Sequence, residues 1–210
     1  MATSLTRNYS IKKYLDRVYN NINPQYQFKA ETKYDWQIWK GNLKAKLTEL
    51  LGSFPQDKCP LKPVILERIE EDGYWREKVV FESQEGVSVP AYVLVPKGIK
   101  KDGKARALLC LHGHGRGKDD VAGIVSSDVE RQQNIRPLNY DYARQFANRG
   151  YVVLAPDAIC FGERSDIPCD WAFTSGLLLG KVLVGLRIWD AMRAIDYLES
   201  RPEVDKERIG

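Results

Sequence analysis

Apolar positions recur every three or four residues in the first part of the chain, which is the spacing of an amphipathic helix. The pattern predicts one helix that includes residues 11–18 and a second over residues 36–50, which ends at Gly52. The segment FPQDKCPLKP that follows is expected to be an extended linker. We therefore expect residues 1–75 to form an N-terminal helical segment and linker.

From residue 77 the apolar period changes to two, which is typical of strands. Strands are expected over residues 77–83 and 87–96, with a turn between them. Two short continuous apolar runs, ARALLCLHG and YVVLAPD, are typical of strands that are covered on both faces. Helices are expected over residues 138–150 and 177–200, and the last residues of the chain can begin another strand.

This order of elements predicts an α/β fold for residues 76–210, in which a right-handed helical crossover joins the third and fourth strands. Ligands of such sheets bind beyond the carboxyl ends of the strands. The candidate chemistry is therefore expected in the loops at residues 112–117 and 157–164.

Composition narrows the class of protein. The chain has 210 residues, of which 43% are hydrophobic and 29% charged, and its formal net charge is +4. Basic and acidic residues are mixed and no apolar run reaches the ~20 residues of a membrane span, so we expect neither a nucleic-acid nor a membrane partner. The first residues lack the apolar core of a signal peptide, which favours a cytoplasmic protein with reduced thiols. The four cysteines form no CxxC pair, the spacing of many zinc and redox sites.

The segment HGHGRGKDD carries three glycines after a buried strand, and such a loop can direct backbone N–H groups at an anion. It is not a phosphate-binding P-loop, because His112 stands where the first glycine is needed and Asp119 follows Lys118 in place of Ser or Thr. A dinucleotide fingerprint is half matched by Gly113 and Gly115, but the third glycine is missing and we expect no helix directly after the loop. Nucleotide binding is therefore the weaker alternative.

The loop also has the form of an oxyanion hole, in which N–H donors meet the charge that develops on a tetrahedral acyl intermediate. The backbone N–H of His114 is the candidate catalytic donor, and His112, Gly113 and Gly115 are candidate substrate-binding residues around it. The ring of His112 is expected to hold the loop by hydrogen bonds. We expect no metal site and no cofactor, because two histidines would need further ligands.

Three segments in this order, LLCLHGHGRG, RGYVVLAPDAICFGER and AIDYLESRPEVDKERIG, resemble the α/β-hydrolase superfamily. The resemblance is to bacterial esterases of the acetyl xylan esterase and dienelactone hydrolase type. It implies a carboxylic-ester hydrolase that acts on a small-molecule or sugar ester through a Ser-His-Asp triad and an acyl-enzyme. It also implies that Asp157 is structural.

Two aromatic residues, Phe161 and Trp171, are candidates for the wall of an acyl pocket, because ligand pockets are mostly apolar and aromatic. Glu163 and Arg164 are expected to form an ion pair that positions the second loop.

The resembling family carries its nucleophile in a GxSxG turn after a strand that follows DxxRIG. No Ser or Cys of this chain has Gly at both −2 and +2. We therefore expect an incomplete α/β-hydrolase fold, with the first four strands and the oxyanion loop but without the triad. In the family the third strand lies between the fourth and the fifth, so the strand that begins at Ala105 is expected to have an open apolar edge.

Two functions from different classes follow. The first is an ester hydrolase that further residues complete. The second is a non-catalytic fragment whose sheet is completed by a homo-oligomer or by a complementary chain.

Overall fold

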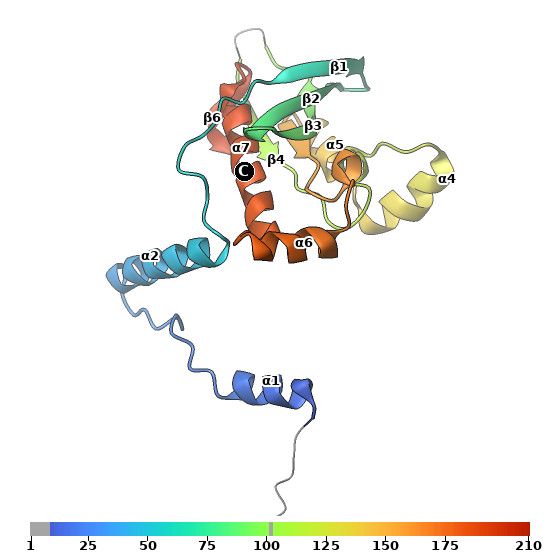
Figure 1. Cartoon of the computed structure of the whole chain (residues 1–210). Coiled ribbons are helices and arrows are strands. Elements are labelled where there is room, and N and C mark those ends of the chain that lie inside the picture. Colours follow the sequence, from blue (N-terminus) through green and yellow to red (C-terminus); the bar gives the residue numbers. More distant parts are fainter. Residues whose placement is uncertain (1–8, 101–102) are drawn as a thin grey trace, which may run out of the picture. The chain divides into compact units, whose positions relative to one another are not determined.

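The computed structural model describes residues 9–100 and 103–210 of the chain, which divides into two compact units, Met1–Leu47 and Thr48–Gly210. Helix α1 (Ile11–Asn20) lies in the first unit, and α2 (Lys33–Leu50) runs from it into the second (Figure 1). Both predicted helices are confirmed. The start of α2 is fixed by reciprocal hydrogen bonds, since Thr32 Oγ1 accepts from Asp35 N (3.1 Å) and Asp35 Oδ2 accepts from Thr32 N (3.0 Å).

The second unit is built on a six-stranded mixed sheet in the order β1-β2-β3-β5-β4-β6. Its first three strands pair antiparallel, and the parallel part consists of β5, β4 and β6. The strands are β1 (Val64–Glu70), β2 (Tyr74–Gln84), β3 (Val87–Pro96), β4 (Ala105–Leu109), β5 (Val152–Pro156) and β6 (Val204–Ile209). The four strands predicted from the apolar pattern are confirmed, β6 is the strand that the last residues were expected to begin, and β1 is additional.

Strand β1 lies within residues 1–75, where a helical segment and linker are expected, but it pairs along its length with β2. The compact units divide after Leu47, whereas the apolar period changes near residue 75. Most side chains of β1 are exposed, so the strand carries no alternation that could have revealed it. Its place depends on backbone pairing with β2.

Strand β6 lies on the side of β4 where the sequence predicts an open edge. Ala105 N donates to Glu203 O (2.8 Å), and Gly210 N donates to Ala107 O (3.0 Å). The expectation of an open edge at β4 is therefore wrong, because the residues after the last helix already continue the sheet. The place that the family resemblance gives to a fifth strand is occupied by β6.

The helix expected over residues 177–200 is two helices, α6 (Cys169–Leu178) and α7 (Leu183–Ser200), which meet at 98°. Gly180 has a φ of +66° at the break, and Lys181 N donates to Gly176 O (2.8 Å) to close the last turn of α6. No single helix among the described residues is long and apolar enough to cross a membrane; α6 and α7 meet that criterion only when they are counted together.

The remaining helical segments are short. The helix expected over residues 138–150 is limited to α5 (Tyr142–Ala147). The others are α3 (Lys118–Ala122), α4 (Asp128–Glu130), a π-helical turn at Arg131–Ile135 and 3-10 turns at Arg136–Leu138 and Gly162–Arg164.

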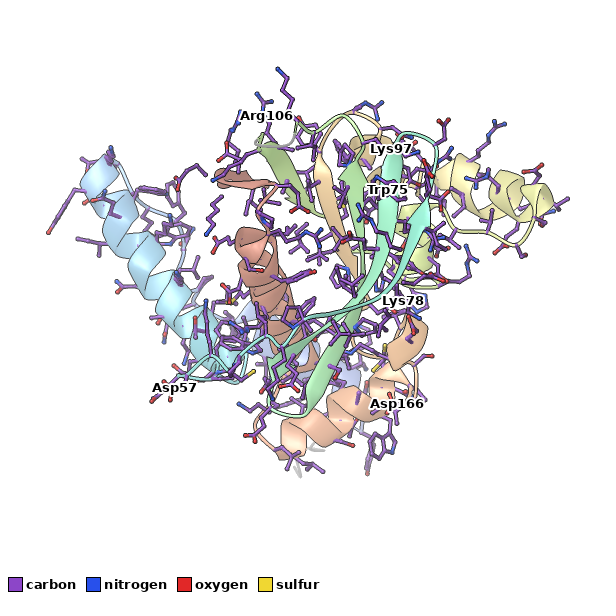
Figure 2. All side chains as sticks on the ribbon, turned by 90° about the horizontal axis from the view of Figure 1, so that it is seen from above. Asp57, Trp75, Lys78, Lys97, Arg106 and Asp166 are labelled. Atoms are coloured by element: carbon purple, nitrogen blue, oxygen red, sulfur yellow. The ribbon has the colours of Figure 1, made fainter. Side chains whose placement is uncertain are left out.

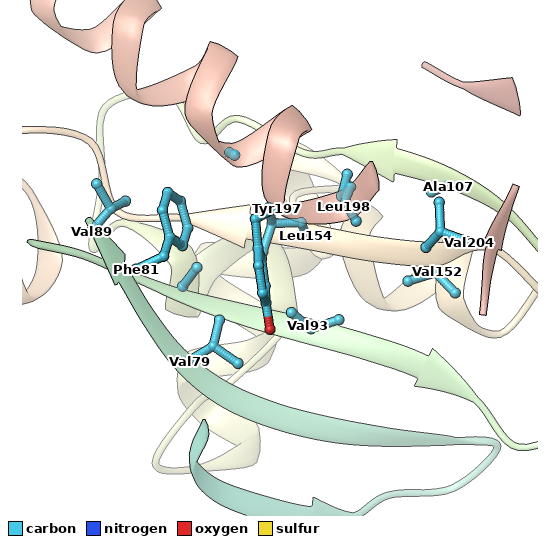
Figure 3. Packing of buried hydrophobic residues seen from close by; sticks show 12 residues of the cluster. Val79, Phe81, Val89, Val93, Ala107, Val152, Leu154, Tyr197, Leu198 and Val204 are labelled. Atoms are coloured by element: carbon cyan, nitrogen blue, oxygen red, sulfur yellow. The ribbon is translucent and has the colours of Figure 1, made fainter. Parts of the chain in front are cut away.

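Two apolar clusters hold the layers together. Tyr197 and Leu198 of α7 pack on one face of the sheet against Phe81, Val93 and neighbouring side chains (Figure 3). On the other face α3 and α5 pack against side chains of β3 and β5. The sheet is thus covered on both faces, and the loops that follow β4 and β5 leave it at the same edge.

Candidate functional site

The ring of His112 joins the loops that follow β4 and β5. Its Nε2 accepts a hydrogen bond from Ala158 N (3.0 Å), and its Nδ1 lies 2.7 Å from Gly113 O. A carbonyl oxygen only accepts, so these two contacts require a neutral imidazole with its proton on Nδ1. The expectation that His112 holds the loop by ring hydrogen bonds is confirmed.

The carboxylate of Asp157 makes the second connection between these loops. Oδ1 accepts from Lys118 N (2.8 Å), and Oδ2 accepts from Lys118 Nζ (2.7 Å) and from Glu163 N (3.0 Å). Both the Asp157 and the Lys118 side chains are buried. The partners of the Asp157 carboxylate are therefore a lysine side chain and two backbone amides. This arrangement is structural and is not that of a triad acid that orients a histidine.

Glu163 extends this cluster to the sheet. Its Oε1 lies 2.5 Å from Lys118 Nζ, and its Oε2 lies 2.8 Å from Lys78 Nζ on β2. Lys78 lies toward the end of the sheet nearer Asp166, whereas Trp75, Lys97 and Arg106 lie toward the opposite end (Figure 2).

The two lysines change the electrostatics of the glutamate. Partial burial raises the pKa of Glu163, but hydrogen bonds and charge from Lys118 and Lys78 outweigh it and leave the pKa below its usual value. Burial lowers the pKa of Lys118, and the hydrogen bonds to Asp157 and Glu163 outweigh it and leave the pKa above its usual value.

The expected Glu163–Arg164 ion pair is wrong, because the two side chains point to different partners. Arg164 NH1 donates to Asp190 Oδ2 on α7 (2.7 Å) and to Asp157 O (3.1 Å). Arg164 therefore fastens the second loop to α7, while Glu163 fastens it to Lys118 and Lys78.

Glycines let the two loops approach so closely. Gly117 and Gly162 have φ values of +84° and +53°, and a Cβ on either would lie 2.2 Å from Asp157 Oδ1. A Cβ on Gly115 would lie 2.3 Å from Asp120 Oδ2, which accepts from Arg116 N (2.8 Å). Side chains at these positions would displace the carboxylates that fix the loops.

A cavity of about 560 Å³ lies beside these loops and α7. The ring of Phe161 stands edge-on to the rings of His112 and His114, with 5.2 Å between centroids in each case. Arg187 lies over the same Phe161 ring, with its guanidinium carbon 5.2 Å from the centroid. The cavity walls are mostly apolar; they include Leu111, Pro156, Ala158, Val184, Ile188, Ala191, Met192 and Ile195.

The structure brings four of the candidate site residues together at this cavity: His112, Gly113, His114 and Phe161. Gly115 lies against Asp120, and Trp171 is 60% exposed on α6, so neither is a lining residue. Sequence reasoning missed Arg187 and Asp190, which also line the cavity. Both are charged residues of α7, which also carries Arg193, Asp196 and Glu199, so their charge alone does not single them out.

A short helix, α3, does follow the glycine loop directly, which corrects the sequence-based expectation that none would. Its first backbone amide, Lys118 N, is already bonded to Asp157, so the protein's own carboxylate takes the place that a phosphate would need. Among the described residues, no group of three or more His, Cys, Asp and Glu side chains could hold a metal ion.

Comparisons with known proteins agree with this architecture. The chain is 32% identical over 169 residues to "Putative hydrolase YtaP" of Bacillus subtilis (strain 168), covering 79% of this chain and 52% of that protein. The chain therefore spans about half the length of this curated relative.

Two solved structures have the same fold. One is described as a putative acetyl xylan esterase from Bacteroides fragilis NCTC 9343; it matches with a TM-score of 0.81 at 24% identity, covering 97% of this chain and 54% of that one. The other is an acetyl xylan esterase from Paenibacillus sp. R4, with a TM-score of 0.50 at 21% identity, covering 88% of this chain and 52% of that one.

A model of the Abhydrolase family matches residues 2–209, which is nearly the whole chain. The fold, the loops after β4 and β5 and this match lead to one assignment: the chain belongs to the Abhydrolase family and has the α/β-hydrolase fold.

Proposed function

We propose that the protein is a carboxylic-ester hydrolase of the acetyl xylan esterase type, in which this chain supplies one side of the oxyanion hole. The observation that carries the proposal is the position of His114. It follows β4 at the carboxyl edge of the sheet and lines the apolar cavity next to Phe161. Within the described residues its backbone N–H donates no hydrogen bond, so it is available to a ligand.

Each part of the site has a task in this reaction. The His114 N–H stabilises the oxyanion of the tetrahedral intermediate, and the apolar wall with Phe161 receives the acyl group. His112 and Asp157 also line the cavity, and we assign them as positioning residues because their hydrogen bonds fix the two loops to each other. The nucleophilic serine and its histidine come from residues outside this sequence, which contains no GxSxG turn.

A small acyl group on a sugar alcohol is the substrate class that we propose. The support is the naming of the solved relatives as acetyl xylan esterases together with the mostly apolar lining of the cavity. The charged lining residues Arg187 and Asp190 provide polar contacts for hydroxyl groups beside that wall.

The test uses the protein as its source makes it, with p-nitrophenyl acetate and acetylated xylo-oligosaccharides as substrates. His114→Pro removes the proposed N–H donor, and losing one such donor costs ~10²–10³ in kcat. The matched control is His114→Ala, which keeps the N–H and removes only the ring. We expect His114→Ala to stay within about tenfold of the unmodified protein, since it loses no oxyanion donor.

Two outcomes would count against the proposal. Equal activity of His114→Pro and the unmodified protein would remove His114 from the oxyanion hole. No hydrolysis of any ester by the folded, unmodified protein would favour the alternative, a non-catalytic chain that a homo-oligomer or a complementary chain completes.

A further inference from the structure

Two of the four cysteines lie together beside the cavity. Cys160 belongs to the loop after β5 and is 8% exposed, and Cys169 is the half-buried first residue of α6. Both are free thiols, and their side chains interact with each other. The proposed ester hydrolysis uses neither of them.

Arg187 of α7 contacts both segments that carry these cysteines. Its NH2 group lies 3.2 Å from Cys169 Sγ and 2.7 Å from Ile159 O, the carbonyl that precedes Cys160. The same guanidinium lies over the ring of Phe161, which follows Cys160. A single side chain thus holds the start of α6 against the turn that carries the partner thiol.

The backbone of this turn is unusual for a residue with a side chain. Cys160 has a φ of +70°, a conformation that favours glycine. The turn is maintained by hydrogen bonds from Cys160 N to Arg164 O (3.0 Å) and from Phe161 N to Ala158 O (3.0 Å). Backbone strain of this kind persists only where surrounding contacts fix it, so the turn that carries Cys160 is held by the structure around it.

The geometry points to Cys160 and Cys169 as a redox-sensitive pair that a peroxide converts into a reversible disulfide. The Cys169 thiolate attacks the peroxide, forms a sulfenic acid and releases hydroxide. The Cys160 sulfur then displaces the sulfenic oxygen, and its proton leaves in water. Two thiols lose two electrons in total, and one hydrogen peroxide is reduced to two waters.

The environments of the two sulfurs support this order. Burial, followed by the neighbouring Cys169, raises the pKa of the Cys160 thiol, which makes it the less reactive thiol toward peroxide. Cys169 is the more exposed of the two and has the Arg187 cation beside it. The new bond would tie the start of α6 to the turn of Phe161, whose ring contacts His112 and His114.

The other cysteines provide internal controls. Cys110 is buried under β4, and burial raises its pKa to about 12, so it is inert toward oxidants. Cys59 is half-buried in the segment after α2, and its carbonyl accepts from Arg193 NH2 (2.6 Å). Cys59 therefore reports how an ordinary, partly accessible thiol of this chain behaves.

The experiment is peptide mapping of the purified protein after reduction, brief treatment with hydrogen peroxide and alkylation of the remaining thiols. Arg164 lies between the two cysteines, so trypsin separates them into different peptides, 150–164 and 165–181. In the native protein we expect these peptides to be joined by a disulfide that dithiothreitol releases. Cys59 should remain a free thiol and should therefore be recovered in its alkylated form. The Cys59→Ser variant should give the same joined peptides, and Cys169→Ser should give none.

A protein unfolded in guanidinium is the control for geometry: there only the short separation in sequence favours the 160–169 link, so the link should form more slowly than in the native protein at the same peroxide concentration. The proposal is overturned if Cys160 and Cys169 of the peroxide-treated native protein are both recovered fully alkylated, because both would then have stayed free thiols. It is equally overturned if the native protein links either of them to Cys59 as readily as to each other. These readouts do not depend on esterase activity.

Discussion

Lys118 and Asp157 are joined by two hydrogen bonds, from the backbone N of Lys118 to Oδ1 and from its Nζ to Oδ2, at 2.8 and 2.7 Å. One residue opens the helix after the glycine loop, and the other directly follows β5. The loop that carries His114 and the loop that carries Phe161 are therefore fixed to each other by a buried ion pair.

Asp157→Asn should strongly destabilise the protein. The change leaves the buried Lys118 ammonium with Glu163 as its remaining carboxylate, so the cost should lie toward the lower end of the about 3–5 kcal/mol for breaking a buried pair. Chemical denaturation measures the loss. The matched control is Lys97→Ala, which breaks the surface pair with Glu70 (2.9 Å) and should cost about 1 kcal/mol or less. Equal effects of the two variants would contradict the role of the buried pair.

Gly162→Ala should destabilise more than Gly86→Ala, although both glycines have positive φ. At Gly86 a Cβ meets nothing within 4 Å, so the variant reports backbone strain alone, about 1–2 kcal/mol. At Gly162 the Cβ would lie 2.2 Å from Asp157 Oδ1 and must push that carboxylate away from Lys118. If the two variants unfold at the same denaturant concentration, the close approach at Gly162 is not a constraint.

His112→Ala should loosen the loop after β5 without changing the charged contacts among Asp157, Lys118 and Glu163. Loss of the Nε2 acceptor frees the Ala158 N–H, and its hydrogen exchange should become faster. His114→Ala is the control, because that ring contacts Phe161 and not Ala158. Unchanged exchange at Ala158 in His112→Ala would show that the ring does not hold the loop.

The stabilising effect of Glu163 should depend on pH. Its pKa in the folded protein lies below the usual 4.5, so its contribution is present above about pH 4.5 and is lost as the pH falls through the folded value. The difference in unfolding free energy between the unmodified protein and Glu163→Gln should therefore shrink on acidification. Exposed Glu85, in the β2–β3 turn, provides the control as Glu85→Gln. A pH-independent Glu163→Gln effect would contradict the Lys118 and Lys78 contacts.

The fold was predictable from sequence wherever one strand or helix carries its own pattern. The period-two pattern of residues 77–96 and the continuous apolar runs of β4 and β5 predict four strands, and all four are found. Strands β1 and β6 have mainly exposed or charged side chains, and only the backbone of a neighbouring strand places them. The break between α6 and α7 was missed because the apolar pattern continues through Gly180.

The site was predictable to the same extent. The glycine loop and the segment after β5 could be placed at one sheet edge, so His112, His114 and Phe161 were expected together, and all three line the same cavity. The partners of the charged residues could not be predicted, because Lys118 and Asp157 are 39 residues apart in sequence. Arg164 had an adjacent glutamate as the obvious partner, yet its guanidinium reaches Asp190 on α7.

The most direct test of the proposed function is labelling of the protein from its source with a fluorophosphonate, followed by peptide mapping of the labelled residue. We expect one labelled serine, within a GxSxG sequence that lies outside residues 1–210, and loss of ester hydrolysis in step with labelling. A label on a serine within residues 1–210, or ester hydrolysis that survives complete labelling, would contradict the account.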